Sequence, residues 1–122
     1  MKGWGRLSLE RALDTLMSLG LTQTEAQAYV FLAKRGPHNG KELANALRIT
    51  KQQLYRSLRK LRAKGMVNAS PQRPAQFSAV SLQKVLELFL KAKMEQAKAL
   101  RASRKELLST WRSMNEKDSA NS

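Results

Sequence analysis

The chain has 122 residues, no cysteine and a formal net charge of +14, from 23 lysines and arginines against 9 acidic residues. This length suits one compact domain with an appendage, and the charge favours a polyanionic partner such as DNA, RNA or an anionic membrane. The lack of cysteine excludes disulfides and thiolate metal sites. No apolar run approaches the roughly 20 residues of a membrane span, and the N-terminus lacks the apolar core of a signal peptide, so we expect a cytoplasmic protein.

The N-terminal segment is predicted to contain one amphipathic helix. Residues 1–5 include two glycines and are expected to be loose. A helical apolar pattern starts at Ser8, and Gly20 is a plausible end for it. The residues predicted to face the core are Leu9, Ala12, Leu13, Leu16 and Met17.

Two further short helices follow. Residues 22–25, Thr-Gln-Thr-Glu, form a capping box that begins the first of them, and Gly36-Pro37 ends it. We expect residues 38–40, His-Asn-Gly, to form a turn. The next helix is predicted over 41–47, and residues 48–50 turn the chain toward the segment that follows.

The segment from Thr50 to Gly65 is the most informative part of the sequence. Leu54, Leu58 and Leu61 recur at helical spacing and form an apolar stripe, with Thr50 as a suitable N-cap. Residues 51–64 include six basic residues and no acidic one. Arg and Lys bind phosphates or guanine edges, and Gln pairs with adenine, so this helix over 50–64 suits a DNA major groove.

The side chains opposite the leucine stripe divide into two predicted roles. The side chains furthest from the stripe are predicted to contact base edges. The lysines, including Lys64, are predicted to bind phosphates. Gln53 suits either role. For Tyr55, at the flank, packing against a backbone group or phosphate is as reasonable as a base contact. The predicted base contacts are Gln52, Arg56 and Arg59, and the predicted phosphate contacts are Lys51 and Lys60.

Two β-compatible runs follow, over 66–70 and 75–80, separated by the polar residues 71–74. They predict a hairpin over 66–80 with a loop longer than two residues. A hairpin directly after a helix-turn-helix is the wing of a winged helix, and Arg73 at its tip is predicted to contact the minor groove or the DNA backbone. The DNA-binding domain is thus expected over 1–80.

The segment over 81–116 contains neither proline nor glycine and predicts one long helix. Apolar residues alternate at spacings of four and three for about four heptads, interrupted by Lys93 and Arg104, as in the seam of a coiled coil. We expect dimerisation, although a helix folded back on its own domain or a frayed tail also fits. Residues 117–122 are expected to be a disordered tail. The predicted dimer contacts are Leu86, Leu90, Ala97, Leu100, Leu107 and Trp111.

Several of these segments together resemble the winged-helix domain of TrmB-type archaeal transcriptional regulators. The resemblance spans roughly residues 10–90 and implies DNA binding, with the helix from Lys51 in the major groove and the wing near Arg73 on the minor groove or backbone. Many relatives have glycine where Gln72 stands, which indicates a less tightly turned wing. Larger relatives carry a C-terminal sugar-sensing domain, and we do not expect sugar sensing in this chain. The matching segments are Leu19–Tyr29, Lys41–Ala44, Leu54–Leu58, Leu61–Val67, Arg73-Pro74 and Phe77–Val80.

An enzyme is not expected. His38 is the sole histidine and lies in a predicted turn, which favours a loop histidine over a catalytic or metal-binding one. The glycines are scattered rather than grouped in a phosphate-binding loop, and acidic clusters suited to divalent metals are lacking. No cofactor or metal is therefore predicted, and no polar cluster points to an effector.

The sequence thus predicts a mainly α fold with a small β-hairpin, in which a winged helix-turn-helix precedes a long C-terminal helix. The function predicted first is a homodimeric transcriptional regulator that binds double-stranded DNA. An architectural, chromatin-like DNA-binding protein is the alternative, because charge alone gives affinity without sequence preference. A winged helix that binds an acidic protein is a third possibility. The mixed charges of the 82–116 segment argue against a membrane role.

Overall fold

The computed structural model describes the backbone of residues 6–120 and the side chains of residues 8–117. The segment 1–5, predicted to be loose, and residues 121–122 lie outside the described residues. The chain divides into two compact units, residues 1–86 and 87–122. The first turn of the C-terminal helix therefore belongs to the first unit.

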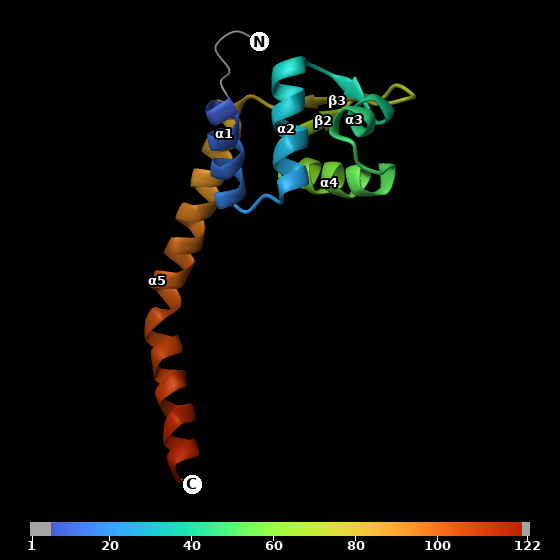
Figure 1. Cartoon of the computed structure of the whole chain (residues 1–122). Coiled ribbons are helices and arrows are strands. Elements are labelled where there is room, and N and C mark those ends of the chain that lie inside the picture. Colours follow the sequence, from blue (N-terminus) through green and yellow to red (C-terminus); the bar gives the residue numbers. More distant parts are fainter. Residues whose placement is uncertain (1–5, 121–122) are drawn as a thin grey trace. The chain divides into compact units, whose positions relative to one another are not determined.

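The first unit is a winged helix-turn-helix, as predicted (Figure 1). Its three strands form one antiparallel sheet in the order β1-β3-β2. The second unit consists of the rest of the last helix. The elements are α1 (Arg6–Ser18), α2 (Gln23–Arg35), β1 (His38–Asn39), α3 (Gly40–Leu47), α4 (Lys51–Ala63), β2 (Val67–Ala69), β3 (Gln76–Ala79) and α5 (Leu82–Ala120).

Capping boxes begin α2, α3 and α4. At α2 the Thr22 hydroxyl accepts the Glu25 N–H at 3.1 Å, and the Glu25 carboxylate accepts the Thr22 N–H at 2.8 Å. Asn39 and Glu42 form the same pair at α3, and so do Thr50 and Gln53 at α4. Each box satisfies two N–H groups that the helix itself leaves unpaired, which stabilises the helix start by about 1 kcal/mol. The predictions of a box at α2 and a Thr50 cap at α4 are confirmed.

The segment His38–Gly40 is not the predicted turn. His38 and Asn39 form strand β1, which pairs with Phe77 and Gln76 of β3, and Gly40 is already the first residue of α3. The expected two-stranded hairpin is consequently part of a three-stranded sheet. Local sequence did not reveal this strand, because a two-residue strand exists only through its pairing with a distant segment.

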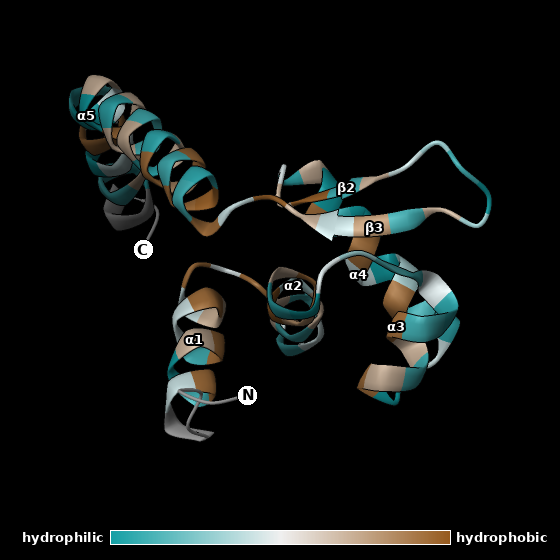
Figure 2. Cartoon of the chain, turned by 90° about the horizontal axis from the view of Figure 1, so that it is seen from above, coloured by the Kyte–Doolittle hydropathy of each residue, from teal (hydrophilic) through white to brown (hydrophobic). Residues whose placement is uncertain are grey.

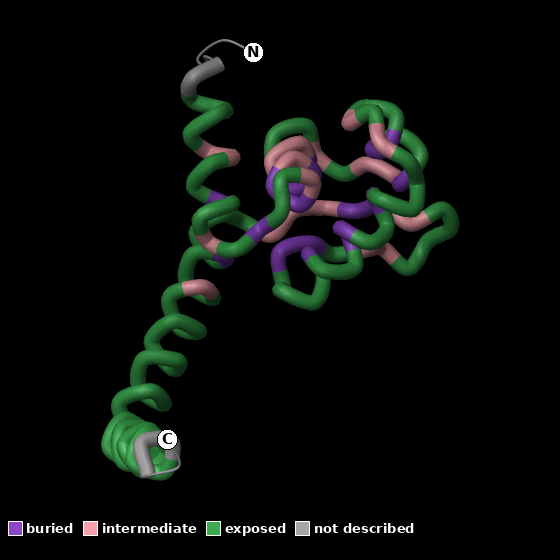
Figure 3. The backbone as a smooth tube through the Cα atoms, turned by 60° about the horizontal axis from the view of Figure 1, so that its bottom comes forward, coloured by how far each residue is buried: buried purple, intermediate pink, exposed green. Residues whose placement is uncertain are grey.

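The core lies where α2 and α4 meet the sheet (Figure 2). The leucine stripe of α4 is buried as predicted, with Leu54 and Leu61 wholly inaccessible to solvent. Figure 3 shows where the buried residues lie, and all those described belong to the first unit, with no described side chain of α5 beyond residue 86 buried. In α1 the prediction was only partly right, because Leu16 is buried whereas Leu9 and Met17 remain 39% and 40% exposed. Helix α1 packs mainly on α2, and this contact covers a narrower face than the apolar pattern offers.

A buried tyrosine joins α2 to the end of the wing. The Tyr29 hydroxyl donates a hydrogen bond of 2.6 Å to the Val80 carbonyl, and the side chain is 2% exposed. Burial raises the pKa of Tyr29 above its ordinary value of 10.0. The bond holds the chain where β3 leads into α5.

We predict that Tyr29→Phe lowers the free energy of unfolding by about 1 kcal/mol at pH 7, because the Val80 carbonyl loses its donor. The unfolded chain loses the Tyr29 proton near pH 10, whereas the folded chain retains it, so ionisation destabilises the wild-type fold as the pH rises above 10. The phenylalanine variant lacks this loss. Urea unfolding followed by circular dichroism should therefore show that the difference in the free energy of unfolding between wild type and Tyr29→Phe shrinks above pH 10. A difference that stays constant would contradict the hydrogen bond and the raised pKa assigned to Tyr29.

The turn between α3 and α4 contains a left-handed residue that is not glycine. Arg48 has φ 56° and ψ 47°, and its N–H bonds back to the end of α3. A side chain in this conformation costs about 1 kcal/mol, which glycine avoids. The strain lies in the turn that sets the angle between the two helices of the helix-turn-helix.

Arg48→Gly is therefore expected to raise the free energy of unfolding by about 1 kcal/mol, and Arg48→Ala, which keeps the Cβ, is expected not to. The two variants lose the same side-chain charge, so their difference isolates the backbone. Chemical denaturation of the two variants and the wild type measures this difference in the free energy of unfolding. Equal stability of the two variants would show that the turn is unstrained.

Helix α5 runs from Leu82 to Ala120, further than predicted. The tail expected to be disordered from residue 117 is helical through 120. Residues 117–120 contain no glycine or proline, and an established helix propagates by one hydrogen bond per added residue, so nothing ends it earlier. In the part of the chain that the structure describes, no helix is both long and apolar enough to cross a membrane.

Candidate nucleic-acid interface

The exposed face of α4 carries five of the predicted DNA contacts in one shallow groove. Every one of these side chains is exposed, and none is held by an ion pair among the described residues. The leucine stripe fixes their direction, because it anchors the opposite face of α4 in the core. The groove is lined by Lys51, Gln52, Tyr55, Arg56 and Arg59.

Two other predicted contacts on α4 lie outside this groove. Lys60 is exposed on the far flank of the helix. The Gln53 side-chain oxygen accepts the Thr50 N–H at 3.1 Å, so the capping box uses this acceptor and leaves the amide NH₂ for other partners. Reading adenine with both the oxygen and the NH₂ of Gln53 would require opening the cap.

Lys64, which the sequence assigned to phosphates, has a side chain that is 35% exposed and forms an ion pair within the protein. Its ammonium lies 3.5 Å from a Glu25 oxygen, and the Glu25 side chain is 2% exposed. The other Glu25 oxygen accepts the Thr22 N–H. The buried carboxylate thus has partners on both sides, and the pair joins the end of α4 to the start of α2. Sequence alone could not show this pair, because its members are distant in the chain.

Tyr55 has a packing role as well as an exposed edge. It is 44% exposed, and its ring meets the Phe77 ring edge-on at a centroid distance of 6.2 Å. Its hydroxyl lies over Gly40 so closely that a Cβ there would meet the phenol oxygen. Tyr55 thus joins α4 to the start of α3 and to the wing. The close approach of Tyr55 to Gly40 was missed from sequence, since the two residues belong to different helices.

The wing carries the remaining predicted contact, Arg73, in the loop between β2 and β3 (Figure 2). Two hydrogen bonds of 2.9 Å between Ser70 and Gln76 close the base of this loop. Arg73 and its neighbours Gln72 and Pro74 are exposed. The loop therefore presents Arg73 to solvent on a closed base.

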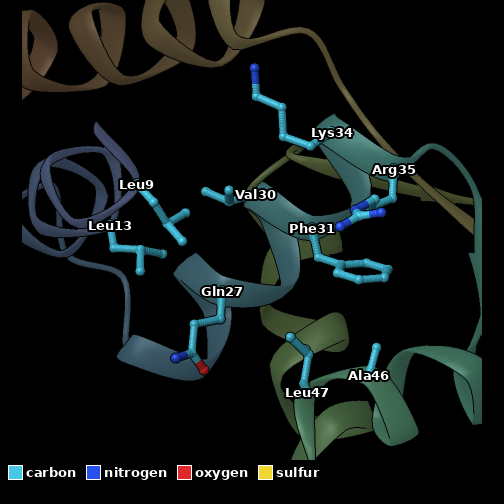
Figure 4. Close-up of a pocket in the computed structure, with 9 residues that line it drawn as sticks. All are labelled: Leu9, Leu13, Gln27, Val30, Phe31, Lys34, Arg35, Ala46 and Leu47. Carbon is cyan, nitrogen blue, oxygen red and sulfur yellow. The ribbon is translucent and has the colours of Figure 1, made fainter. Parts of the chain in front are cut away.

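A separate apolar pocket of about 410 Å³ lies between α1, α2 and α3 (Figure 4). Leu9 and Leu13 face Val30 across it, while Phe31 and Leu47 line the side toward α3. None of its lining residues comes from α4. This pocket is thus distinct from the groove that carries the predicted DNA contacts.

His38, the first residue of β1, lies beside this region and packs against Phe31. Its Nδ1 is 2.7 Å from the Gly36 carbonyl oxygen, and its ring meets Phe31 edge-on at 4.9 Å. Among the described residues, no three histidine, cysteine or acidic side chains come together in a way that could hold a metal. The surroundings of His38 are those of a structural side chain.

The sequence of the winged helix matches a known family. The model of TrmB, the sugar-specific transcriptional regulators, matches residues 16–83, which is more than half of the chain. The chain belongs to the TrmB family. The matched TrmB region includes α2, α3, α4 and the wing, and ends within the first turn of α5. This is the family that the resemblance indicated. A comparison with curated proteins finds no match.

Solved structures agree with the TrmB assignment. TrmBL2, described as an archaeal chromatin protein with a novel mode of DNA binding, is 30% identical over 84% of this chain, with a TM-score of 0.73. This chain spans 41% of the TrmBL2 chain. The ST1889 protein of Sulfolobus tokodaii is 25% identical over 75% of this chain and 97% of its own, with a TM-score of 0.62. MepR of Staphylococcus aureus, solved with DNA, is 19% identical over 85% of this chain and 92% of its own, with a TM-score of 0.52, and shares the fold alone.

Proposed function

We propose that this TrmB-family chain regulates transcription as a homodimer, with α4 in the major groove of duplex DNA and the wing on the minor groove or backbone. The observation that carries the proposal is the groove on α4, where three cations, an amide and a phenol lie exposed on one face. Arginine and glutamine there suit base edges, and lysine suits phosphates. No acidic residue lies between Glu42 and Glu87, so no negative side chain in this interval weakens the positive electrostatic potential that attracts DNA.

The proposal of a homodimer is supported by the apolar side of α5. Of the described side chains from 90 to 117, all but Ser103 are exposed, including Trp111 at 61% and Leu100 at 63%. An isolated helix with such a face is marginal in water and gains stability by burying the face. The four-three spacing of these residues suits a second copy of the same helix. Lys93 and Arg104 lie on the seam and limit its strength.

An architectural role is the second candidate. The net charge of +14 gives sequence-independent affinity for DNA, and TrmBL2, the 30% identical relative, is described as a chromatin protein. Both functions use the same α4 groove. They differ in how strongly the contacts distinguish one sequence from another.

Selection from a random pool of duplex DNA at moderate salt separates these functions. A regulator should enrich one sequence, bound at least about a thousandfold more tightly than random DNA, with half-sites about one helical turn or a multiple apart. For an architectural protein, the ratio of the affinity for the best sequence to the affinity for random DNA should be near one. Failure to bind any duplex at low salt would refute both and favour a winged helix that binds an acidic protein.

A further inference from the structure

Helix α5 carries a second basic surface, distinct from the α4 groove. In the second unit, four cations recur at an interval of seven residues and so lie along one side of the helix, over about 32 Å at 1.5 Å per residue. Each of them directly follows a position of the apolar seam, which places it about 100° around the helix from that position. They would therefore stay exposed when the seam is paired. This basic stripe comprises Lys91, Lys98, Lys105 and Arg112.

The stripe is free of partners within the structure. All four side chains are exposed, and among the described residues none forms an ion pair or hydrogen bond through its side chain. No acidic residue occurs between Glu95 and Glu106. A shallow groove here is lined by four cations and one apolar residue: Arg101, Arg104, Lys105, Arg112 and Leu108.

We infer that the basic stripe of α5 is a second binding surface for duplex DNA, which holds phosphates independently of α4. Long flexible basic side chains at regular intervals along a helix suit the regular phosphates of a duplex. An anionic bilayer fits less well, because a helix lying on lipid has cations on both sides of its apolar face. Here the stripe lies on one side only, and we assign the apolar face to the dimer. The inference rests on the proposed DNA binding and adds to it a surface without sequence preference.

The test uses a variant that removes the stripe without changing net charge. Lys91, Lys98 and Lys105 become glutamine, and so do Glu95, Glu106 and Glu116, which leaves the net charge at +14. Affinity for a random-sequence duplex is measured against salt concentration, in the full chain. If the stripe binds phosphates, the slope of log K against log salt should fall by about two to three, because each lost phosphate contact removes about 0.9.

Two controls separate this inference from the proposed function. Sedimentation should show the same oligomeric state for variant and wild type, since the changed positions lie off the seam. The stripe change should also reduce affinity in an Arg56→Ala/Arg59→Ala background, in which the α4 groove is impaired. If the salt slope is unchanged in both backgrounds, the inference that the stripe binds DNA is overturned. If the Arg56→Ala/Arg59→Ala change alone abolishes DNA binding, the result supports only the α4 groove as a binding surface. Unchanged DNA binding with lost binding to phosphatidylserine vesicles would assign the stripe to lipid instead.

Discussion

The Leu100→Asp/Leu107→Asp variant is expected to be monomeric and to bind a palindromic site at least about a hundredfold more weakly than the wild type. Both leucines are more than half exposed on α5, so the changes leave the core of the winged helix untouched. In a paired seam, each aspartate would place an uncompensated charge against apolar side chains. Two half-sites held together gain affinity from effective concentration, and a monomer loses that gain.

Sedimentation equilibrium and DNA titration measure the two effects on the same samples. The matched control is Ala102→Asp/Ser109→Asp, which adds the same charge to the same stretch of α5, opposite the seam. This control should remain dimeric and lose much less affinity. If the seam variant stays dimeric, or if both pairs weaken binding equally, the dimer is not built on this seam.

Arg56→Ala is expected to weaken binding to the preferred sequence by about 1–3 kcal/mol and to relax the preference at one base position. The reason is that Arg56 lies in the α4 groove, furthest from the leucine stripe, where an arginine suits a guanine edge. Lys60→Ala, on the flank of the same helix, should weaken all sequences alike and reduce the salt slope by about one.

Fluorescence anisotropy on the preferred sequence, on single-base variants and on random DNA distinguishes the two substitutions. Both positions are exposed, so neither change should alter stability. Equal losses for both variants on preferred and random DNA would remove the distinction between base and phosphate contacts. That result would favour the architectural function.

The winged helix could be predicted because its signals are local. The spacing of Leu54, Leu58 and Leu61 fixed which face of α4 is buried, and the Thr22–Glu25 box fixed where α2 begins. The placement of Gln52, Arg56 and Arg59 opposite the stripe followed from the same helical period.

The features that sequence missed all depend on distant contacts. Strand β1 exists through its pairing with β3, the Lys64–Glu25 pair joins two separate helices, and the Tyr55 hydroxyl lies closely over Gly40. Two of these contacts alter the interpretation of predicted site residues. Lys64 pairs with Glu25 within the protein, and Tyr55 joins α4 to α3 and to the wing. These contacts therefore help to hold α4 in position, and the helical spacing of residues in the sequence could not predict them.

Photo-crosslinking from a single cysteine tests the position of α4 on DNA most directly. The chain has no cysteine of its own, so Gln52→Cys can carry a photoreactive maleimide at one defined position in the α4 groove. The same probe at Thr15→Cys, exposed on α1, is the control. If α4 lies in the major groove, the probe at 52 should crosslink to the bases of a bound duplex, and the probe at 15 should not. No crosslink to bases from 52, or equal crosslinking from both positions, would contradict the placement of α4 in the major groove.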